Sequence, residues 1–311
     1  MVYELTRKVE WEEVKCALCN TNDTTLLFVA KERLFGIPGE FPIVRCKQCG
    51  LVYVNPRPNR QTMADFYPSE YVPHGQVTSQ KGYRVGVKLW HAYTRLFLHN
   101  IDLLEDIKPS RVLDVGTGSG EYLLILREKG WDPVGVEPAH NAAALAIKKG
   151  IQVYQGEIHD VGFPDQSFGA VTFRGSLEHI HDPLEALRET ERVLQDDGVV
   201  LIEVPNFRCP EVRIFGRWWT PIEAPRHLYH FTKETLTAML KRAGFSVVRT
   251  EHQYCYRSAV DSLSEYLGGH WQRMLTNHLF YGISLPLVTM LAWVCGEGHL
   301  LRIRARKSKG V

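Results

Sequence analysis

Short apolar runs alternate with longer amphipathic stretches through the middle of the chain, and this alternation predicts the fold. The expected strands lie within residues 111–115, 134–137, 151–158, 163–173 and 199–204. Runs rich in valine, leucine and isoleucine are typical of strands buried on both faces, and the helical stretches between them are typical of crossover connections. The sequence therefore predicts an α/β fold with a doubly wound, mostly parallel, Rossmann-like sheet that binds ligands at the carboxyl ends of its strands.

A glycine turn (residues 116–120) follows the first expected strand. Gly116, Gly118 and Gly120 let the main chain bend sharply and approach a ligand without a Cβ in the way. A dinucleotide turn would read Gly-x-Gly-x-x-Gly and leave the next helix N-terminus free for a pyrophosphate. Here the third glycine comes one residue early, and the carboxylate of Glu121 behind it would repel a phosphate. The turn therefore predicts a ligand that carries no phosphate.

This segment resembles motif I of the class I S-adenosylmethionine-dependent methyltransferases, and later segments resemble the family's later motifs in the same order. Glu137 ends the second expected strand, 23 residues after Asp114, where an acid can accept hydrogen bonds from both ribose hydroxyls. Residues 156–158 resemble a Gly-Asp-Ala segment that recognises adenine, and residues 176–183 resemble a Leu-Glu-His-x-x-Asp-Pro segment. The resemblance implies S-adenosyl-L-methionine as cofactor. The implied cofactor-binding residues are Asp114, Gly116, Gly118, Gly120, Glu137, Glu157 and Ile158.

Two further strands complete the expected sheet. Residues 245–250 form an apolar run after a helix that Thr232 caps, and residues 299–306 resemble the family's seventh, antiparallel strand. We expect a seven-stranded sheet whose last strand is antiparallel. The alternative is a Rossmann-like domain that has lost its cofactor or binds a nucleotide.

Four cysteines near the N-terminus have the spacing of a metal site. Cys16 and Cys19 form one Cys-x-x-Cys pair and Cys46 and Cys49 form another, with 26 residues between the pairs. Four thiolates at about 2.3 Å close a tetrahedral zinc shell, so the Zn²⁺ would be structural. Two disulfides, or a site that has lost its metal, are the alternatives. The expected organisation is a zinc ribbon (1–60), a linker and lid helix (61–107), and a methyltransferase domain (108–311).

Histidines are the candidates for acid–base chemistry. A sulfonium already supplies a reactive methyl group, so the protein must mainly align the reactants, and a base is needed only for a hydroxyl acceptor. Imidazole suits that role near neutral pH. The candidate catalytic residues, in order of preference, are His179, His230 and His227. A hydrogen-bonded structural role is the alternative for each. The spacing of His227 and His230 would also suit a metal, although no third ligand stands out nearby.

The acceptor site and the cellular location are less marked in the sequence. We expect the loop with Trp218 and Trp219 to line the acceptor pocket. Residues 279–296 lie inside an apolar helical insert at 256–297 and carry no charge over 18 positions. They are either a lid or a segment that dips into a membrane surface.

The net charge of +2 does not suggest nucleic acid as a partner, and no apolar signal core opens the chain. A cytoplasmic protein is expected, with peripheral membrane contact if residues 279–296 dip into a membrane surface rather than form a lid.

The sequence therefore predicts an S-adenosylmethionine-dependent methyltransferase. Its acceptor would be a hydroxyl or a carbon of a small molecule, a glycan or a lipid-linked compound. The alternative is a catalytically silent scaffold, in which the ribbon and the insert bind partners and the cofactor only stabilises the fold.

Overall fold

The computed structural model describes residues 8–68, 104–253, 256–268 and 296–308. They fall in two compact units. The first contains Met1–Tyr67, Arg174–Glu191 and Ile202–Val311, and the second contains Pro68–Phe173 and Arg192–Leu201. These units divide the chain differently from the three expected segments. Most of the expected lid helix and nearly all of the apolar run at 279–296 lie outside the described residues.

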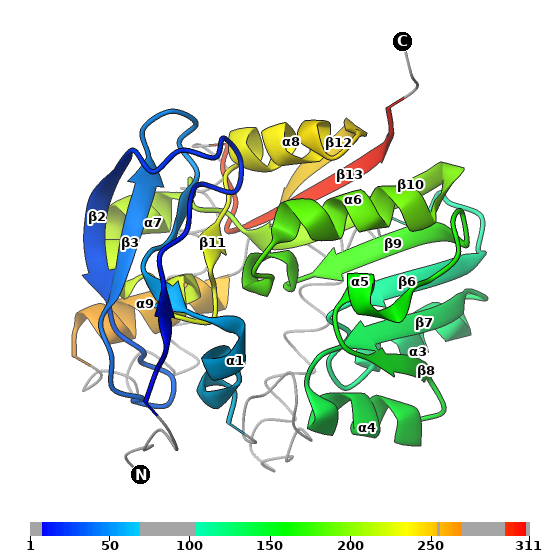
Figure 1. The fold of residues 1–311 in the computed structure, drawn as a ribbon, viewed down its shortest axis with the longest axis horizontal. Helices are drawn as coiled ribbons and strands as arrows, with labels where there is room; N and C mark the ends of the chain where they lie inside the picture. The colour runs from blue at the N-terminus through cyan, green and yellow to red at the C-terminus, as the bar shows by residue number, and fades with distance from the viewer. Residues whose placement is uncertain (1–7, 69–103, 254–255, 269–295, 309–311) are drawn as a thin grey trace. The chain divides into compact units, whose positions relative to one another are not determined.

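The main sheet has seven strands in the order β12–β13–β10–β9–β6–β7–β8 (Figure 1). Its strands are β6 (Arg111–Val115), β7 (Asp132–Glu137), β8 (Gln152–Gln155), β9 (Phe168–Arg174), β10 (Leu194–Pro205), β12 (Phe245–Gln253) and β13 (Leu300–Lys307). Strand β6 pairs in parallel with β7 and β9, β7 pairs in parallel with β8, and β12 pairs antiparallel with β13. The predicted Rossmann-like sheet with an antiparallel last strand is confirmed.

The fifth strand begins earlier than predicted. Helix α6 (Pro183–Val193) is followed at once by β10, which begins with Leu194 rather than at Val199. Residues 195–197 are partly or fully exposed, so the first part of the strand lacks the apolar pattern from which its boundary was predicted. Before α6, Asp182 Oδ1 accepts a hydrogen bond from the Glu185 backbone N–H at 3.0 Å and so caps the helix.

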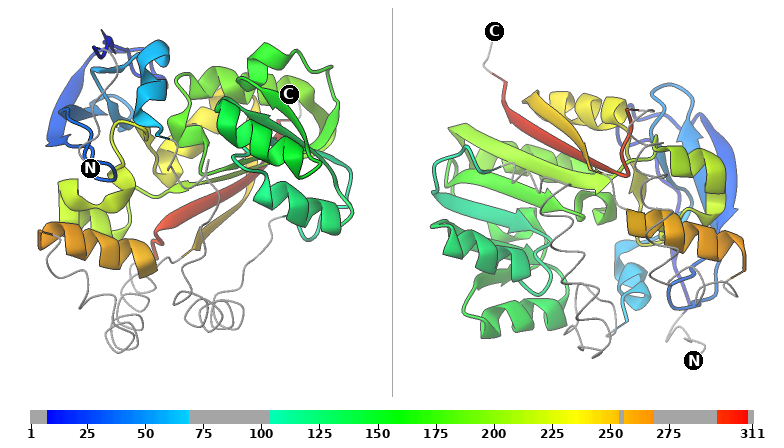
Figure 2. Two further views of the ribbon diagram at one scale, coloured as in Figure 1. Left: turned by 90° about the horizontal axis from the view of Figure 1, so that it is seen from below. Right: turned by 180° about the vertical axis from the view of Figure 1, so that it is seen from behind.

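In the second unit, helices pack directly on the strands that carry the glycine turn. Helix α3 (Glu121–Glu128) contacts β7, and helix α4 (His140–Lys148) contacts β7 and β8 (Figure 2). Gly120 has a φ of +81°, and a Cβ there would lie 2.9 Å from the Cβ of Ala146 on α4. Such a contact is too close for any side chain, so this turn position requires glycine for both its backbone conformation and its packing.

The N-terminal segment forms part of a second, smaller sheet. Strands β2 (Thr24–Ala30), β3 (Phe41–Cys46) and β4 (Val52–Val54) are antiparallel neighbours, and β11 (Tyr229–His230) pairs antiparallel with β4. A separate two-stranded sheet pairs β1 (Trp11–Glu12) with β5 (Arg57–Pro58). Residues from the C-terminal half of the chain therefore complete the sheet whose strand β3 ends with Cys46.

The other helices of the first unit are short. They are α1 (Arg60–Met63), α7 (Pro210–Phe215), α8 (Lys233–Arg242) and α9 (Tyr256–Tyr266), with 3₁₀ turns that include η3 (Leu177–His179) and η5 (Thr220–Ile222). Thr232 caps α8 as predicted, with Oγ1 accepting from the Thr235 N–H at 3.3 Å. Helix α9 packs against α7 and η5 (Figure 2). In the part of the chain that the structure describes, no helix has the length and apolar character that crossing a bilayer would require.

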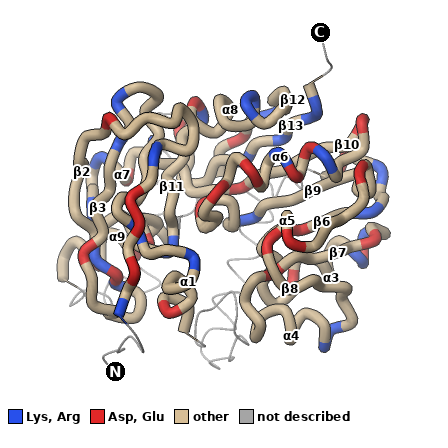
Figure 3. The backbone as a smooth tube through the Cα atoms, viewed as in Figure 1, with Lys and Arg blue, Asp and Glu red and all other residues tan. Residues whose placement is uncertain are grey.

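Acidic and basic residues are interspersed along the described backbone of both units (Figure 3). This distribution agrees with the low net charge of +2.

Candidate functional site

Two buried acids lie at the carboxyl ends of neighbouring strands in the second unit. Asp114 on β6 and Glu137 at the end of β7 are each 3% exposed. The Asp114 Oδ1 accepts a hydrogen bond from Thr172 Oγ1 at 2.5 Å. The Glu137 Oε2 accepts from the Gly118 N–H at 2.8 Å, and its Oε1 accepts from the Ala139 N–H at 2.9 Å. The Glu137 side chain therefore ties the glycine turn to the next strand.

Burial determines how easily Glu137 carries its charge. Burial raises the pKa of the carboxyl, the N–H groups of Ala139 and Gly118 lower it, and the neighbouring Asp114 raises it further, so that the net shift is upward. A bound group that donates hydrogen bonds or carries positive charge would offset this cost. The site is therefore suited to hydroxyl and ammonium groups.

The backbone of the glycine turn does not present a phosphate site. The Gly116 N–H donates to the Val136 carbonyl at 2.8 Å and the Gly120 N–H donates to the Thr117 carbonyl at 3.1 Å. Because the Gly118 N–H donates to Glu137, all three glycine N–H groups bond within the protein. A phosphate cradle needs such groups pointing at the ligand. This geometry agrees with the prediction of a phosphate-free ligand and disfavours the nucleotide alternative.

The predicted adenine-binding residues lie at the start of a one-turn helix, α5 (Ile158–Val161). Glu157 is its N-cap: its side chain accepts from the N–H of Asp160, and the Glu157 N–H donates to Asp160 Oδ2 at 3.0 Å. The neighbouring Gly156 N–H donates to the Glu137 carbonyl at 3.2 Å, which links this turn to the buried acid. The structure brings Glu157 and Ile158 to the turn beside Glu137, and their contact with adenine stays a prediction.

A second group of polar side chains lies in the first unit. Ligand atoms of Glu178, His179 and His227, the histidine cluster, all lie within 4.8 Å of one another. The two imidazole rings are nearly perpendicular, with their centroids 4.5 Å apart. His230 is buried beside Phe207, with ring centroids 5.4 Å apart, and is not one of these three. Of the three predicted histidines, the structure therefore brings two together.

Burial makes these histidines weak bases. Burial lowers the pKa of His179 to about 3, with a further decrease caused by His227. It lowers the pKa of His230 to about 3 as well, and it lowers that of His227 although Glu223 opposes the shift. All three imidazoles are therefore neutral at pH 7. Sequence reasoning missed Glu178 and Glu223, although one directly precedes His179 and the other lies four residues before His227.

A buried arginine, Arg226, fixes the backbone carbonyl that contacts His179. Arg226 bridges two acids, with Nη2 2.7 Å from Glu32 Oε1 and Nε 2.9 Å from Glu223 Oε1. Its Nη1 donates to the Phe66 carbonyl at 3.0 Å. The Arg226 carbonyl lies 3.0 Å from His179 Nδ1, so the ion pairs fix the residue that positions this imidazole.

The four predicted metal ligands are also close together. The Sγ atoms of the cysteines lie within 4.8 Å of one another, with Cys16 Sγ 3.4 Å from Cys49 Sγ and Cys19 Sγ 3.3 Å from Cys46 Sγ. A disulfide has sulfurs about 2.05 Å apart, so these cysteines are free thiols. Tetrahedral zinc with four bonds of about 2.3 Å needs sulfurs about 3.8 Å apart, which these side chains reach with small shifts. The arrangement therefore fits a four-thiolate metal ion.

The tryptophan loop has a different role from the one expected. Trp219 is fully buried and packs edge-on against Phe207 and His299, with ring centroids 6.1 Å away in both contacts. Its ring is part of the core of the first unit, so the expectation that this residue lines an acceptor pocket was wrong. Trp218 is partly buried, with the Arg217 guanidinium 4.2 Å from its ring centroid. The sequence of two adjacent tryptophans does not indicate which of the two side chains is buried in the core.

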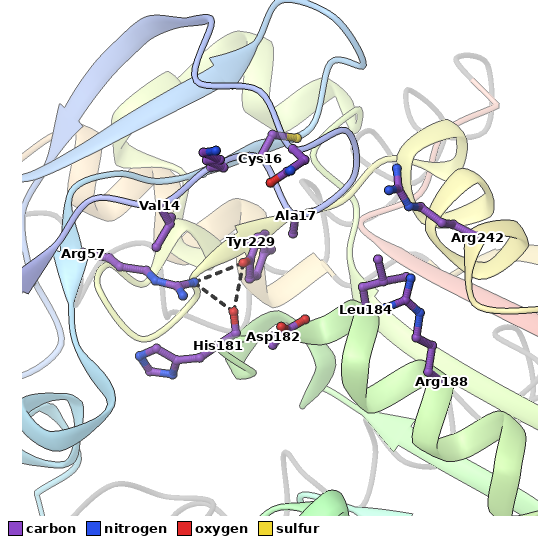
Figure 4. A pocket seen from close by; sticks show the side chains of 12 residues that line it. Val14, Cys16, Ala17, Arg57, His181, Asp182, Leu184, Arg188, Tyr229 and Arg242 are labelled. Atoms are coloured by element: carbon purple, nitrogen blue, oxygen red, sulfur yellow. Dashed lines mark hydrogen bonds between the residues drawn. The ribbon is translucent and has the colours of Figure 1, made fainter.

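A pocket of about 360 Å³ lies in the first unit beside the cysteine knuckle (Figure 4). At its wall, Arg57 donates to the His181 carbonyl and to the Tyr229 hydroxyl, both at 3.1 Å. Arg188 and Arg242 line the opposite side (Figure 4). The histidine on this wall, His181, was not among the predicted catalytic residues.

Comparison with known proteins agrees with this geometry. A family model described as "Methyltransferase domain" matches residues 89–250, just over half of the chain. The demethylmenaquinone methyltransferase of Thermotoga maritima is 26% identical over 171 residues, which are 47% of this chain and 75% of that protein. The enzyme of the same name from Thermus thermophilus is 34% identical over 174 residues, which are 47% of this chain and 79% of that protein.

Solved structures show the same fold at lower identity. A chain in the complex of the Haloferax volcanii Trm112 methyltransferase activator has a TM-score of 0.51 at 17% identity, covering 74% of this chain and 95% of that one. The [4+2]-cyclase SpnF has a TM-score of 0.50 at 21% identity, covering 82% of this chain and 98% of that one. Since a cyclase shares the fold, the fold alone does not specify the reaction. The family match over residues 89–250 decides the assignment, and the chain belongs to the methyltransferase-domain family.

Proposed function

We propose that this protein transfers a methyl group from S-adenosyl-L-methionine to a hydroxyl or carbon of a small-molecule, glycan or lipid-linked acceptor. The observation that carries the proposal is the glycine turn whose N–H groups all bond within the protein and whose Gly118 is held by Glu137. When bound, the cofactor supplies an electrophilic methyl group on a cationic sulfur. Asp114 and Glu137 offer the negative charge and hydrogen-bond acceptors that its ammonium and ribose hydroxyls require.

Replacing Glu137 by glutamine is expected to weaken binding of S-adenosylhomocysteine about 10- to 100-fold. The amide loses the charge-assisted hydrogen bonds to ribose and loosens the hold on the Gly118 N–H, at a cost of about 1.5–3 kcal/mol. Isothermal titration calorimetry on the full chain measures the change. Glu128→Gln, at the exposed end of α3, is the matched control and should bind like the parent protein. Equal affinity in the Glu137 variant would remove this residue from the site.

Replacing His179 by glutamine is expected to lower turnover at least about tenfold and leave S-adenosylhomocysteine affinity nearly unchanged. We propose that the neutral imidazole of His179 assists deprotonation of the acceptor, a role worth about 10²-fold or more when the base is well matched. Its low pKa places the effect at the lower end of that range. Transfer of labelled methyl groups, together with calorimetry, separates the two properties. Unchanged turnover would exclude His179 from the mechanism, and the same test applies to His230 and His227.

Demethylmenaquinone is the first acceptor to assay, because both relatives described above are named demethylmenaquinone methyltransferase. Glycans and polyprenyl-linked compounds follow, since the expected acceptor classes include them. Contact with a membrane surface through residues 279–296 stays part of the proposal, and liposome flotation tests it. The names of the relatives describe enzymes, which gives no support to the silent scaffold.

We also propose that Cys16, Cys19, Cys46 and Cys49 bind one structural Zn²⁺. Their free thiols and close spacing support this. Four thiolates leave no open position on the metal, so the ion would stabilise the fold rather than take part in transfer.

A further inference from the structure

Backbone carbonyls orient both rings of the histidine cluster. His179 Nδ1 lies 3.0 Å from the Arg226 carbonyl and 2.9 Å from the Tyr67 hydroxyl, and His227 Nδ1 lies 2.8 Å from the Pro221 carbonyl. A carbonyl oxygen can only accept, so a histidine that bonds to it through Nδ1 carries its proton there. In that tautomer the Nε2 of each neutral ring carries a lone pair.

A carboxylate lies near one of these nitrogens, and a second buried carboxylate belongs to the cluster. His227 Nε2 lies 3.5 Å from Glu223 Oε2, an approach of two acceptors with no proton between them. Glu178 is 2% exposed, and its buried Oε2 has no hydrogen-bond partner among the residues that the structure describes. A buried polar atom left without a partner is costly and calls for an explanation such as an ion. The buried cation Arg226 is already bonded to Glu32 and Glu223.

The backbone holds the three side chains where they meet. The His179 N–H donates to the Ser176 carbonyl at 3.1 Å within the 3₁₀ turn η3, and the Leu228 N–H donates to the Glu178 carbonyl at 2.8 Å. Both segments belong to the first unit. Backbone hydrogen bonds therefore hold the two segments that carry the three side chains. A backbone carbonyl also orients each histidine ring, as is usual for histidines that bind metals.

We propose that Glu178, His179 and His227 bind one divalent first-row transition-metal cation, at a site separate from the four cysteines. Two imidazole nitrogens and one carboxylate are a common ligand set for Zn²⁺, Fe²⁺, Co²⁺ and Ni²⁺. With bonds of about 2.1 Å the ligand atoms would lie about 3.4 Å apart, so the cluster closes by roughly an ångström around the ion.

Three protein ligands leave positions open on the ion, and a hydroxyl bound there would lose its proton more easily. His179 would then assist deprotonation of the acceptor through the cation and not as a free base. This role in methyl transfer rests on the proposed function, whereas the binding of the cation does not.

The test is titration of the full chain with Co²⁺ after the cysteines have been filled with zinc. We expect one added equivalent of Co²⁺, with visible bands of nitrogen and oxygen ligands and without the sulfur-to-cobalt band that thiolates would give. Glu178→Gln and His227→Gln are each expected to weaken this binding at least about tenfold. His181→Gln is the control, because this nearby buried histidine bonds to the Pro58 carbonyl and lies outside the cluster.

Absence of a second cobalt equivalent in the parent protein would overturn the proposal. A sulfur-to-cobalt band, or full binding by the Glu178 variant, would do so as well. The count and spectrum of the parent protein decide the question even where a variant does not fold. Since no methyl donor is present, failure here leaves the proposed transfer activity untouched, and failure of the transfer assay leaves the cation site untouched.

Discussion

Replacement of Arg226 by methionine is expected to lower the free energy of unfolding by about 3–5 kcal/mol, because it leaves buried carboxylates without their cation. The Arg226 side chain is fully buried and bonds to both Glu32 and Glu223. Methionine keeps much of the apolar volume, so the change isolates the loss of charge and hydrogen bonds. Denaturant unfolding, followed by far-ultraviolet circular dichroism, measures it.

An exposed ion pair is the matched control for this variant. Lys47 Nζ lies 2.7 Å from Asp23 Oδ1, but both side chains are more than half exposed. Pairs in this environment contribute about 0–1 kcal/mol, so Lys47→Met should change stability little. Similar effects of the two substitutions would show that Arg226 is not the buried bridge described above.

Replacement of Cys46 by serine is expected to abolish stoichiometric zinc binding and to destabilise the first unit by several kcal/mol. Structural zinc in small cysteine sites contributes on the order of 10 kcal/mol of apparent binding free energy, part of which stabilises the folded state. Zinc content by mass spectrometry and the midpoint of thermal unfolding together measure the loss.

Cys209 is the control for the zinc variant. It is buried and free but lies outside the four-cysteine group. Cys209→Ala should keep one zinc per chain and lose only the packing of a small side chain, about 1 kcal/mol. Zinc content that is unaffected by Cys46→Ser would exclude the ribbon site.

The features that could be predicted from the sequence are those with a local sequence pattern. The apolar strands and the glycine turn leave a continuous pattern. Glu137 could be predicted because parallel neighbours end at the same edge, which brings it to Gly118 across 19 residues. The cysteine cluster could be predicted as well, because the Cys-x-x-Cys spacing is itself typical of a metal site.

The features that were missed depend on contacts between distant segments. Strand β11 has only two residues, too few to show a period, and it pairs with β4 from the other half of the chain. The Arg226–Glu32 pair joins residues 194 positions apart. Glu178 was read as part of a motif, and only the folded chain shows that its carboxylate meets His227. The contact partners of these residues cannot be recognised from a single sequence.

The central claim is that the acids beside the glycine turn bind a methyl donor rather than a nucleotide. Calorimetric titration of the full chain with S-adenosylhomocysteine, and separately with NAD⁺ under the same conditions, tests it most directly. We expect saturable one-site binding of S-adenosylhomocysteine and no binding of NAD⁺. Binding of NAD⁺ alone, or of neither compound, would contradict it.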